Sequence, residues 1–216
     1  MSSSLPYSYL AIEGNIGAGK TSLAKILATK FNAELALESF AENTFLPQFY
    51  EQPERFAFPL EMSFLAERYQ QIKQQQELAT KLKSPLISDY IFEKSVLFAQ
   101  VNLKGHELEL FRKFFSLINQ QLARPGLVVY LKKTTDSLLK NIAARGRDYE
   151  KSIPAEYLQN VSDQYLQHFK TLNGETVLIV ESDELDFVEN HVHLKFLIDL
   201  VQEKHIPGIH EILPEF

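Results

Sequence analysis

Short apolar segments alternate with longer amphipathic stretches along the chain, and this alternation predicts the fold class. The apolar segments are mostly continuous, which is typical of parallel strands covered by helices on both faces. Segments with this character are Tyr9–Glu13, Ala33–Glu38, Pro85–Asp89, Leu127–Leu131 and Thr176–Val180. Helical spacing of apolar residues predicts helices over Thr21–Phe31, Pro59–Leu82, Glu107–Leu122, Asp136–Ala144, Ala155–Leu172 and Glu184–Gln202. Pro59 suits the first turn of the longest of these helices.

Strands that alternate with helices predict an α/β fold, with a five-stranded parallel sheet, helices on both faces and right-handed crossovers. The length of 216 residues fits a single domain over residues 1–216. No internal repeat and no linker rich in glycine and serine divides the sequence.

Composition and charge exclude several classes of function. The 22 basic and 28 acidic residues give a net charge of −6, which argues against a general binder of nucleic acid or anionic membranes. The absence of cysteine excludes disulfides, thiolate metal sites and a cysteine nucleophile. No apolar run approaches the ~20 residues that a membrane span needs. The first seven residues lack the features of a secretory signal, so we expect a cytoplasmic protein.

A glycine-rich loop is the strongest chemical signal in the sequence. Its residues match the pattern G-x-x-x-x-G-K-[ST] and are Gly14, Asn15, Ile16, Gly17, Ala18, Gly19, Lys20 and Thr21. The loop follows a predicted strand and begins a predicted helix, so its backbone N–H groups and the helix N-terminus favour a phosphate. Lys20 is placed to reach the β- and γ-phosphates of ATP, and Thr21 offers a hydroxyl group to Mg²⁺.

Two acidic residues at strand ends indicate what accepts the phosphate. The sequence contains neither the N-K-x-D motif of switch GTPases nor the apolar strand ending in Asp-Glu that is typical of ATP-driven motors. Instead, Glu38 ends the second predicted strand and Asp89 ends the third, on the edge of the sheet where ligands bind. One acid to take a proton and one to hold a metal suit a kinase with a small hydroxyl acceptor. The alternative is that each acid caps the following helix.

With these residues in place, the chain resembles the deoxynucleoside kinases, most closely their bacterial deoxyadenosine/deoxyguanosine kinase branch. The resemblance covers about residues 8–200 and rests on segments 12–20, 49–55, 87–89 and 145–154 together with Glu38. The last segment, R-G-R-D-Y-E-K-S-I-P, looks like the family's lid over ATP, here about residues 141–154. The resemblance implies a P-loop kinase fold and, as is usual in the family, a homodimer. Residues that suit such an interface are Phe64, Leu65, Phe114, Phe115 and Leu117, although burial in the core explains them equally well.

The resemblance also implies roles for individual residues. Glu38 resembles the carboxylate that accepts or holds the 5′-hydroxyl of the deoxyribose, and Asp89 resembles the acid assigned to Mg²⁺ or to proton transfer. Tyr50 and Glu150 would contact the 3′-hydroxyl, and Arg68 would lie in the base pocket. Further residues implied are the phosphate-clamping Arg145 and Arg147 and the residues beside the adenine of ATP, Leu185, Asp186 and Phe187, although an acidic helix start explains that last segment equally well.

Three positions depart from the family pattern. Tyr90 replaces an arginine after the third-strand acid, and Lys94, about one turn into the next helix, is a candidate replacement for the missing cation. Asn141 replaces a lid arginine. Glu61 replaces the glutamine that reads the base, and an ionised Glu61 would accept hydrogen bonds from guanine better than from adenine. A pair between Glu61 and Arg68 would leave room for either purine, or would leave Glu61 with no contact to the base.

The sequence therefore predicts an enzyme that uses ATP and Mg²⁺ to phosphorylate the 5′-hydroxyl of a 2′-deoxynucleoside, with a preference for purines. A nucleoside monophosphate kinase is an alternative, but it would need a second set of arginines in the acceptor pocket. A regulator that binds ATP without transferring phosphate is a further alternative, which two strand-end acids and a complete lid disfavour.

Overall fold

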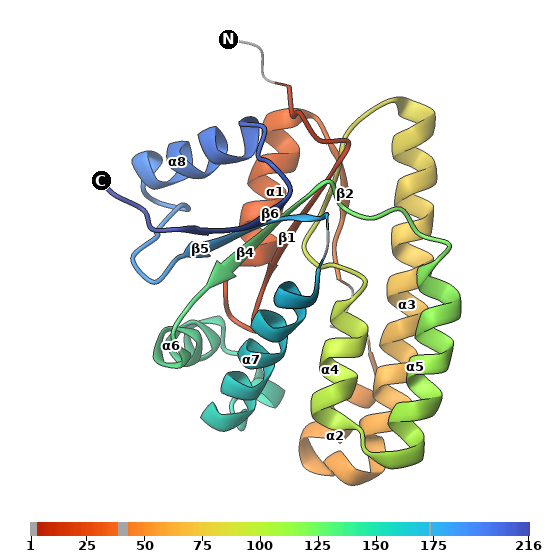
Figure 1. Ribbon diagram of the computed structural model, residues 1–216. Coiled ribbons are helices and arrows are strands. Elements are labelled where there is room, and N and C mark those ends of the chain that lie inside the picture. Colours follow the sequence, from red (N-terminus) through yellow and green to blue (C-terminus); the bar gives the residue numbers. More distant parts are fainter. Residues whose placement is uncertain (1–3, 39–42, 173) are drawn as a thin grey trace.

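The computed structural model describes residues 4–38, 43–172 and 174–216, and a six-stranded sheet lies at its centre (Figure 1). Residues 1–3, the start of the segment in which no secretory signal was expected, lie outside this range. The strands are β1 (Tyr9–Gly14), β2 (Glu34–Ala36), β3 (Leu86–Ser88), β4 (Leu127–Lys132), β5 (Thr176–Glu181) and β6 (Gly208–Ile212). They lie in the order β2-β3-β1-β4-β5-β6, and every neighbouring pair is parallel.

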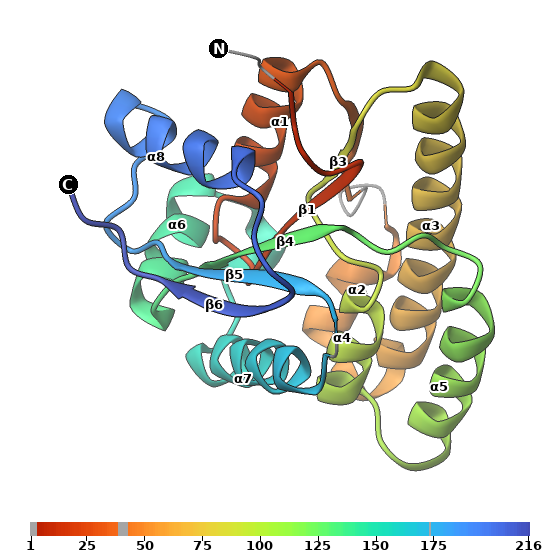
Figure 2. The same ribbon diagram turned by 45° about the horizontal axis from the view of Figure 1, so that its top comes forward.

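Helices cover both faces of this sheet (Figure 2). They are α1 (Lys20–Phe31), α2 (Phe45–Glu51), α3 (Pro53–Leu82), α4 (Lys94–Asn102), α5 (Gly105–Asn119), α6 (Thr135–Arg145), α7 (Ala155–Thr171) and α8 (His191–Gln202), with a 3₁₀ turn at Asp148–Glu150. The helices α1 and α8 pack on one face, and α4 and α7 pack on the other. Beyond the β2 edge, α2, α3 and α5 form a further helical layer with α4.

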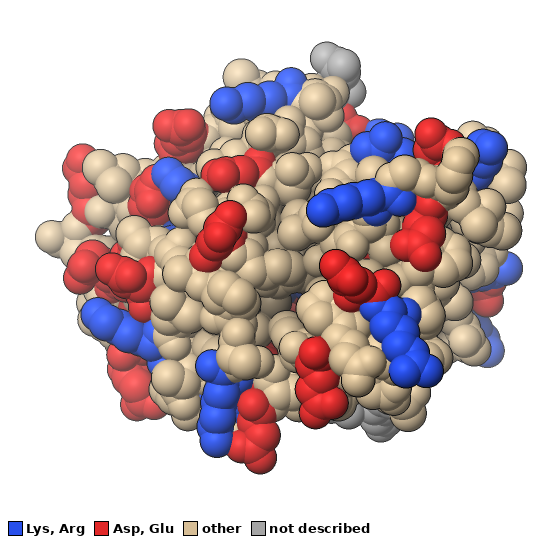
Figure 3. All heavy atoms as spheres, turned by 90° about the horizontal axis from the view of Figure 1, so that it is seen from below, with Lys and Arg blue, Asp and Glu red and all other residues tan. Residues whose placement is uncertain are grey.

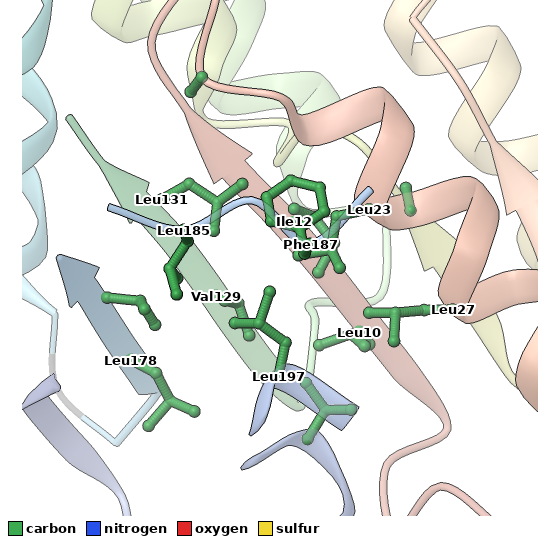
Figure 4. Packing of buried hydrophobic residues seen from close by; sticks show 14 of the residues in the cluster. Leu10, Ile12, Leu23, Leu27, Val129, Leu131, Leu178, Leu185, Phe187 and Leu197 are labelled. Carbon is green, nitrogen blue, oxygen red and sulfur yellow. The ribbon is translucent and has the colours of Figure 1, made fainter. Parts of the chain in front are cut away.

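The continuous apolar character of β1 follows from this double cover. Leu10 and Ile12 face α1 and α8, where they pack with Leu23 and Leu27 of α1 (Figure 4). Residues of opposite parity in β1 face α4 and α7 instead. Because side chains alternate across a strand, a strand that is buried on both faces is apolar throughout.

The sheet differs from the predicted one by a sixth strand. The strand β6 pairs with β5 at the edge of the sheet, and its residues alternate between half-buried and exposed. An edge strand of this kind lacks the continuous apolar run by which the other strands were predicted, so the prediction of five strands was wrong.

Two helix starts and one short helix also differ from the sequence analysis. The helix α3 begins at Pro53, so Pro59 lies inside it and not in its first turn. The helix α8 begins at His191 because the side chain of Asn190 caps it, accepting from the backbone N–H of Val192. The helix α2 was not predicted, since it is too short to show a full apolar period.

The order of the strands places the site. The chain leaves β1 toward β2 on one side, while β4 lies on the other side of β1. This reversal of direction beside β1 is the position where open parallel sheets bind ligands, outside the carboxyl ends of the strands. The glycine-rich loop, Glu38 and Asp89 all follow strands at this edge.

Candidate active site

The loop between β1 and α1 has a backbone shape that requires glycine at two positions. Gly17 and Gly19 have φ angles of 84° and 93°, which side-chain-bearing residues rarely adopt. A Cβ atom on Gly17 would also lie 2.9 Å from the carbonyl oxygen of Leu138. The glycines therefore let the loop fold tightly around a phosphate site, as the sequence motif predicts.

Lys20 lies at the centre of this loop. Its Nζ donates to the backbone oxygen of Asn15 over 2.9 Å, so the ammonium group is held inside the loop. Burial, together with the nearby charge of Lys94, lowers the pKa of Lys20 to about 8, against the opposing effect of neighbouring carboxylates. A buried ammonium group in this position favours the binding of an anion, because the anion restores its charged form.

Two asparagine side chains join the loop to the rest of the site. Asn15 donates through Nδ2 to the carbonyl oxygen of Leu158 and to the hydroxyl of Ser162, both on α7. Asn141, the residue in place of a family arginine, donates to the carbonyl oxygen of Gly17 over 2.8 Å. The side chain of Asn15 therefore fixes the loop to α7, and any contact between Asn15 and a phosphate would come from its backbone.

Asp89 connects the loop to the second strand-end acid. Its Oδ2 accepts a hydrogen bond from the hydroxyl of Thr21 over 2.5 Å, and its Oδ1 accepts from the backbone N–H of Glu38 over 2.8 Å. The hydroxyl and carboxylate oxygens are ligands that Mg²⁺ prefers, and Mg²⁺ usually takes one or two protein ligands together with phosphate and water. The residues present therefore fit Mg²⁺. The described residues contain no cluster of three or more acidic or histidine ligands, which agrees with a metal completed by nucleotide phosphates.

Glu38 forms a buried ion-pair network with two cations. Arg68 on α3 and Lys94 on α4 each lie 2.6 Å from one of its oxygens, and the Glu38 side chain is 8% exposed. Burial would raise the pKa of Glu38, but Lys94 and Arg68 outweigh it and lower that pKa to about 2. Lys94 thus places a cation beside the acid, while Tyr90 is buried and its hydroxyl donates to Gln71.

The pair between Glu61 and Arg68 that the sequence suggested does not form. Arg68 donates to Glu38 and to the hydroxyl of Ser95 instead. Oε1 of Glu61 accepts from Nδ2 of Asn102 over 2.6 Å, and Oε2 is buried without a hydrogen-bond partner among the described residues. Burial raises the pKa of Glu61 to about 7. Glu61 is therefore a buried acid with one oxygen held and one open.

The lid brings its charged residues together over the site. Glu150 in the 3₁₀ turn accepts from Arg145 over 2.5 Å and from Arg147 over 3.1 Å. The ring of Tyr149 stacks on the ring of Tyr50 from α2, with centroids 6.2 Å apart. Burial raises the pKa of the Tyr50 hydroxyl, and Glu150 raises it further, so this group stays a neutral donor.

A cavity of about 450 Å³ unites these groups. Its wall contains the predicted catalytic and acceptor-binding residues Lys20, Glu38, Tyr50, Glu61, Arg68, Asp89, Lys94, Arg145, Arg147 and Glu150, and also Asn102 and Tyr157. The molecular surface seen from below carries acidic and basic side chains interspersed, with no broad basic patch on that face (Figure 3). The volume and the polar wall of this cavity favour a small, neutral acceptor beside the phosphate loop.

The segment expected at the adenine of ATP lies next to the loop but outside this cavity. Phe187 packs so closely that a Cβ atom on Gly19 would lie 3.1 Å from its ring. Leu185 and Phe187 are buried in the core between the sheet and α1 (Figure 4). Oδ1 of Asp186 accepts from the backbone N–H groups of Val188 and Glu189 in the loop before α8, so Asp186 does not lie at a helix start. A contact between these residues and adenine stays a prediction.

Sequence reasoning missed two polar residues of the site. Asn102 ends α4, donating to Glu61 and, over 3.3 Å, to the hydroxyl of Tyr157. Glu13 accepts from the backbone N–H groups of Gly14 and Ile91, which links the phosphate loop to the loop after Asp89. Glu13 had a signal, a carboxylate inside an apolar strand, whereas Asn102 lies in no motif.

Comparisons with known proteins agree with this geometry. The family model for deoxynucleoside kinase matches residues 10–207. Deoxyguanosine kinase of Bacillus subtilis (strain 168) is 38% identical over 186 residues, covering 84% of this chain and 90% of that protein. Deoxyadenosine kinase of Dictyostelium discoideum is 31% identical over 174 residues, covering 79% of this chain and 70% of that protein.

Solved structures extend the comparison to the fold. Deoxyadenosine kinase from M. mycoides with products dCMP and dCDP bound has a TM-score of 0.75 and 26% identity, covering 89% of this chain and 96% of that chain. The same kinase with dATP has a TM-score of 0.77 at 22% identity, covering 90% of this chain and 99% of that chain. With a family model that spans nearly all of its sheet and its whole phosphate loop, the chain belongs to the deoxynucleoside kinase family.

Proposed function

We propose that this enzyme transfers the γ-phosphate of ATP to the 5′-hydroxyl of a purine 2′-deoxynucleoside and so serves nucleotide salvage. The observation that carries the proposal is the position of Glu38. This ionised carboxylate lies in the wall of the cavity, and its backbone N–H donates to Asp89, which in turn accepts from Thr21 of the phosphate loop. An acceptor hydroxyl at Glu38 would therefore lie close to the phosphates.

The proposed transfer follows from the charges around this acid. The 5′-oxygen attacks the γ-phosphorus, the bond from that phosphorus to the β-phosphate oxygen breaks, and Glu38 takes the hydroxyl proton. Lys20 and the lid arginines Arg145 and Arg147 balance the negative charge that moves to the phosphate oxygens. Lys94, 2.6 Å from Glu38, supplies a cation near the attacking oxygen.

Mg²⁺ would be held by Thr21 and Asp89 and, when bound, supplies a positive charge between the phosphates. Thr21 donates to Asp89, and this bond holds the two residues that would bind Mg²⁺ next to each other. That arrangement leaves Glu38 as the acid available to the acceptor, with its own two oxygens oriented by Arg68 and Lys94.

The acceptor part of the cavity suits a neutral nucleoside better than a nucleoside monophosphate. Glu38, Glu61 and Glu150 line it, and the two cations beside Glu38, Arg68 and Lys94, are each already paired with one of its oxygens. A phosphate on the acceptor would face these carboxylates. Tyr50 and Glu150 would bind the 3′-hydroxyl, and Glu61 would face the base. The names of the relatives from Bacillus subtilis and Dictyostelium discoideum, deoxyguanosine kinase and deoxyadenosine kinase, support a purine.

A homodimer in the cytoplasm, where ATP is available, completes the proposal. Leu110, Phe114 and Leu117 on α5 are exposed apolar residues that suit a subunit interface. Phe64 and Leu65, also considered for this surface, are buried in the core and are excluded from it. No helix in the described ranges is both long and apolar enough for a membrane crossing.

The experiment is an ADP-release assay with ATP, Mg²⁺ and each of the four deoxynucleosides, with dAMP and dGMP as competing acceptors. We expect turnover with deoxyguanosine and deoxyadenosine, and mass spectrometry should find the 5′-monophosphates as products. Turnover confined to dAMP or dGMP would identify a nucleoside monophosphate kinase instead. ATP binding without turnover on any acceptor would identify a regulator.

A further inference from the structure

The side chain of Asn102 determines which atom of Glu61 faces the acceptor. Its Nδ2 donates to Oε1 of Glu61 over 2.6 Å and to the hydroxyl of Tyr157 over 3.3 Å, so both amide protons have acceptors. Oε2 of Glu61 is buried, lies in the wall of the cavity and has no partner within the described ranges. A buried carboxyl oxygen without a partner is unfavourable, so Oε2 needs either a proton or a ligand donor.

We propose that Asn102 is a specificity-determining residue. It holds one oxygen of Glu61, so that the other oxygen faces the base. That second oxygen distinguishes deoxyguanosine from deoxyadenosine, because it accepts a hydrogen bond when Glu61 is ionised and donates one when Glu61 is protonated. The proposal rests on the proposed function, since it assumes that a purine deoxynucleoside occupies the cavity. It adds a residue and a rule for base choice that the function alone does not contain.

The rule follows from the hydrogen-bonding chemistry of the two bases. Because Nδ2 of Asn102 can only donate, Oε1 must accept, and a proton on Glu61 therefore resides on Oε2. An ionised Glu61 presents Oε2 as an acceptor, which matches the N1–H and 2-amino donors of guanine. A protonated Glu61 presents Oε2–H as a donor, which matches the N1 acceptor of adenine. Each base thus has its own protonation state of the same side chain.

The surroundings of Glu61 keep both states accessible near neutral pH. Its pKa is raised to about 7, chiefly by burial and also by Glu38, against the lowering effects of Arg68, Asn102 and Lys94. The charged and titratable groups that face it come from five segments and are Arg68 on α3, Lys94 on α4, Glu38 after β2, Tyr50 on α2 and Tyr157 on α7. Arg68 and Lys94 are each bonded to Glu38, so neither cation fixes Glu61 in its ionised state.

The test measures the ratio of kcat/KM for deoxyguanosine to that for deoxyadenosine from about pH 6 to about pH 8. The ratio cancels titrations that both substrates share, such as those of Lys20 and Glu38. In the native enzyme it should rise at least about fivefold over this range, the lower limit for mismatching one buried hydrogen bond. In Glu61→Gln the ratio should be independent of pH and should favour deoxyadenosine.

Asn102→Leu separates positioning from a merely structural role. Since the amide of Asn102 lowers the pKa of Glu61, its loss should move the rise of the ratio to higher pH, and the ratio at pH 7 should fall. A thermal unfolding curve for each variant checks folding, and Asn102→Ser provides a smaller change if the leucine variant does not fold. In either variant, a rise at the native pH would overturn the role of Asn102.

The outcomes keep this inference distinct from the proposed function. Turnover of both purines with a ratio that does not change with pH in the native enzyme would overturn the inference and leave the function standing. Absence of turnover with both purines would overturn the function, and the inference would fail with it. A ratio that rises with pH and becomes constant in Glu61→Gln would support the inference.

Discussion

The hydroxyl of Thr21 donates a hydrogen bond to Oδ2 of Asp89 over 2.5 Å, which joins the first turn of α1 to the residue that follows β3. The bond brings together two oxygen atoms from segments far apart in the sequence. Since the other oxygen of Asp89 accepts from the backbone of Glu38, one side chain links the phosphate loop to the second strand-end acid. Replacing Asp89 therefore tests which of the two acids binds the metal and which one accepts the proton.

We expect Asp89→Asn to weaken the response to Mg²⁺. An amide oxygen is a weaker ligand than a carboxylate, so the Mg²⁺ concentration for half-maximal rate should rise by ~10-fold or more. Titration of the ADP-release rate with Mg²⁺ measures this change, and Thr21→Ser, which keeps the hydroxyl group, is the matched control. A large loss of kcat at saturating Mg²⁺, with the half-maximal Mg²⁺ concentration unchanged, would exchange the roles of Asp89 and Glu38.

The activity should fall at alkaline pH because of Lys20. Burial lowers the pKa of Lys20 to about 8, so the free enzyme loses this charge as pH rises through that value. The kcat/KM for ATP, at saturating deoxynucleoside, should decrease above about pH 8. Lys20→Ala should lower kcat by ~10²–10³ and remove this decrease. A profile that stays level to about pH 9.5 would show that Lys20 remains charged without nucleotide.

Lys94 should act as a cation at the acceptor oxygen. Lys94→Met removes a charge 2.6 Å from Glu38, and we expect kcat to fall by ~10²–10³ because a buried charge contact near the reacting oxygen is lost. Lys94→Arg should retain much more of the activity. If the methionine variant keeps kcat within about twofold of the native value, Lys94 does not compensate for the arginine that Tyr90 replaces.

Arg147 should act in the transition state. Arg147→Ala should lower kcat and kcat/KM for the deoxynucleoside together, since we expect the lid arginine to contact the transferred phosphate and not the nucleoside. Lys151 on the same lid is the control, because it is exposed and pairs only with Asp148 among the described contacts. Its alanine variant should have native kinetics. An increase confined to the KM of the deoxynucleoside would place Arg147 outside the phosphate clamp.

Glu61→Gln should change the pH dependence of stability. The folded-state pKa of about 7 lies above the ordinary value of 4.5, so protonation of Glu61 stabilises the folded state at low pH. This contribution to the free energy of unfolding is lost as pH rises from about 4.5 to about 7. The glutamine variant has no such loss. Its free energy of unfolding relative to the native protein should therefore increase by about 2–3 kcal/mol from about pH 5 to about pH 8. Urea unfolding at the two pH values measures this difference, and a constant difference would contradict the raised pKa.

The sequence predicted the fold where one strand or loop carries its own signal. The strands β1, β3, β4 and β5 are continuous apolar runs because helices cover both faces, and the glycines of the phosphate loop are required by its backbone. The edge strand β6 has no such run, since every second residue in it is exposed. Local pattern therefore reveals strands that are buried on both faces and misses β6, which is not.

The site was predicted less completely because its side chains come from separate segments. Glu38 and Asp89 were found through their place at strand ends. Arg68 on α3 was expected in the base pocket, with a pair to Glu61 as one alternative, but it pairs with Glu38. Asn102 meets Glu61 only because α4 packs on α3, and such a contact leaves no mark in either local sequence.

The bonds of Asn15 and Asn141 have a consequence for how the lid can move. Asn15 fixes the phosphate loop to α7, and Asn141 fixes the same loop to α6. The lid segment therefore joins two helices that are each bonded to the phosphate loop, and a rigid-body movement of both helices away from that loop would break both bonds. A movement that keeps these bonds would bend only the segment between the helices, whose ends are Gly146, with a φ of 72°, and Pro154.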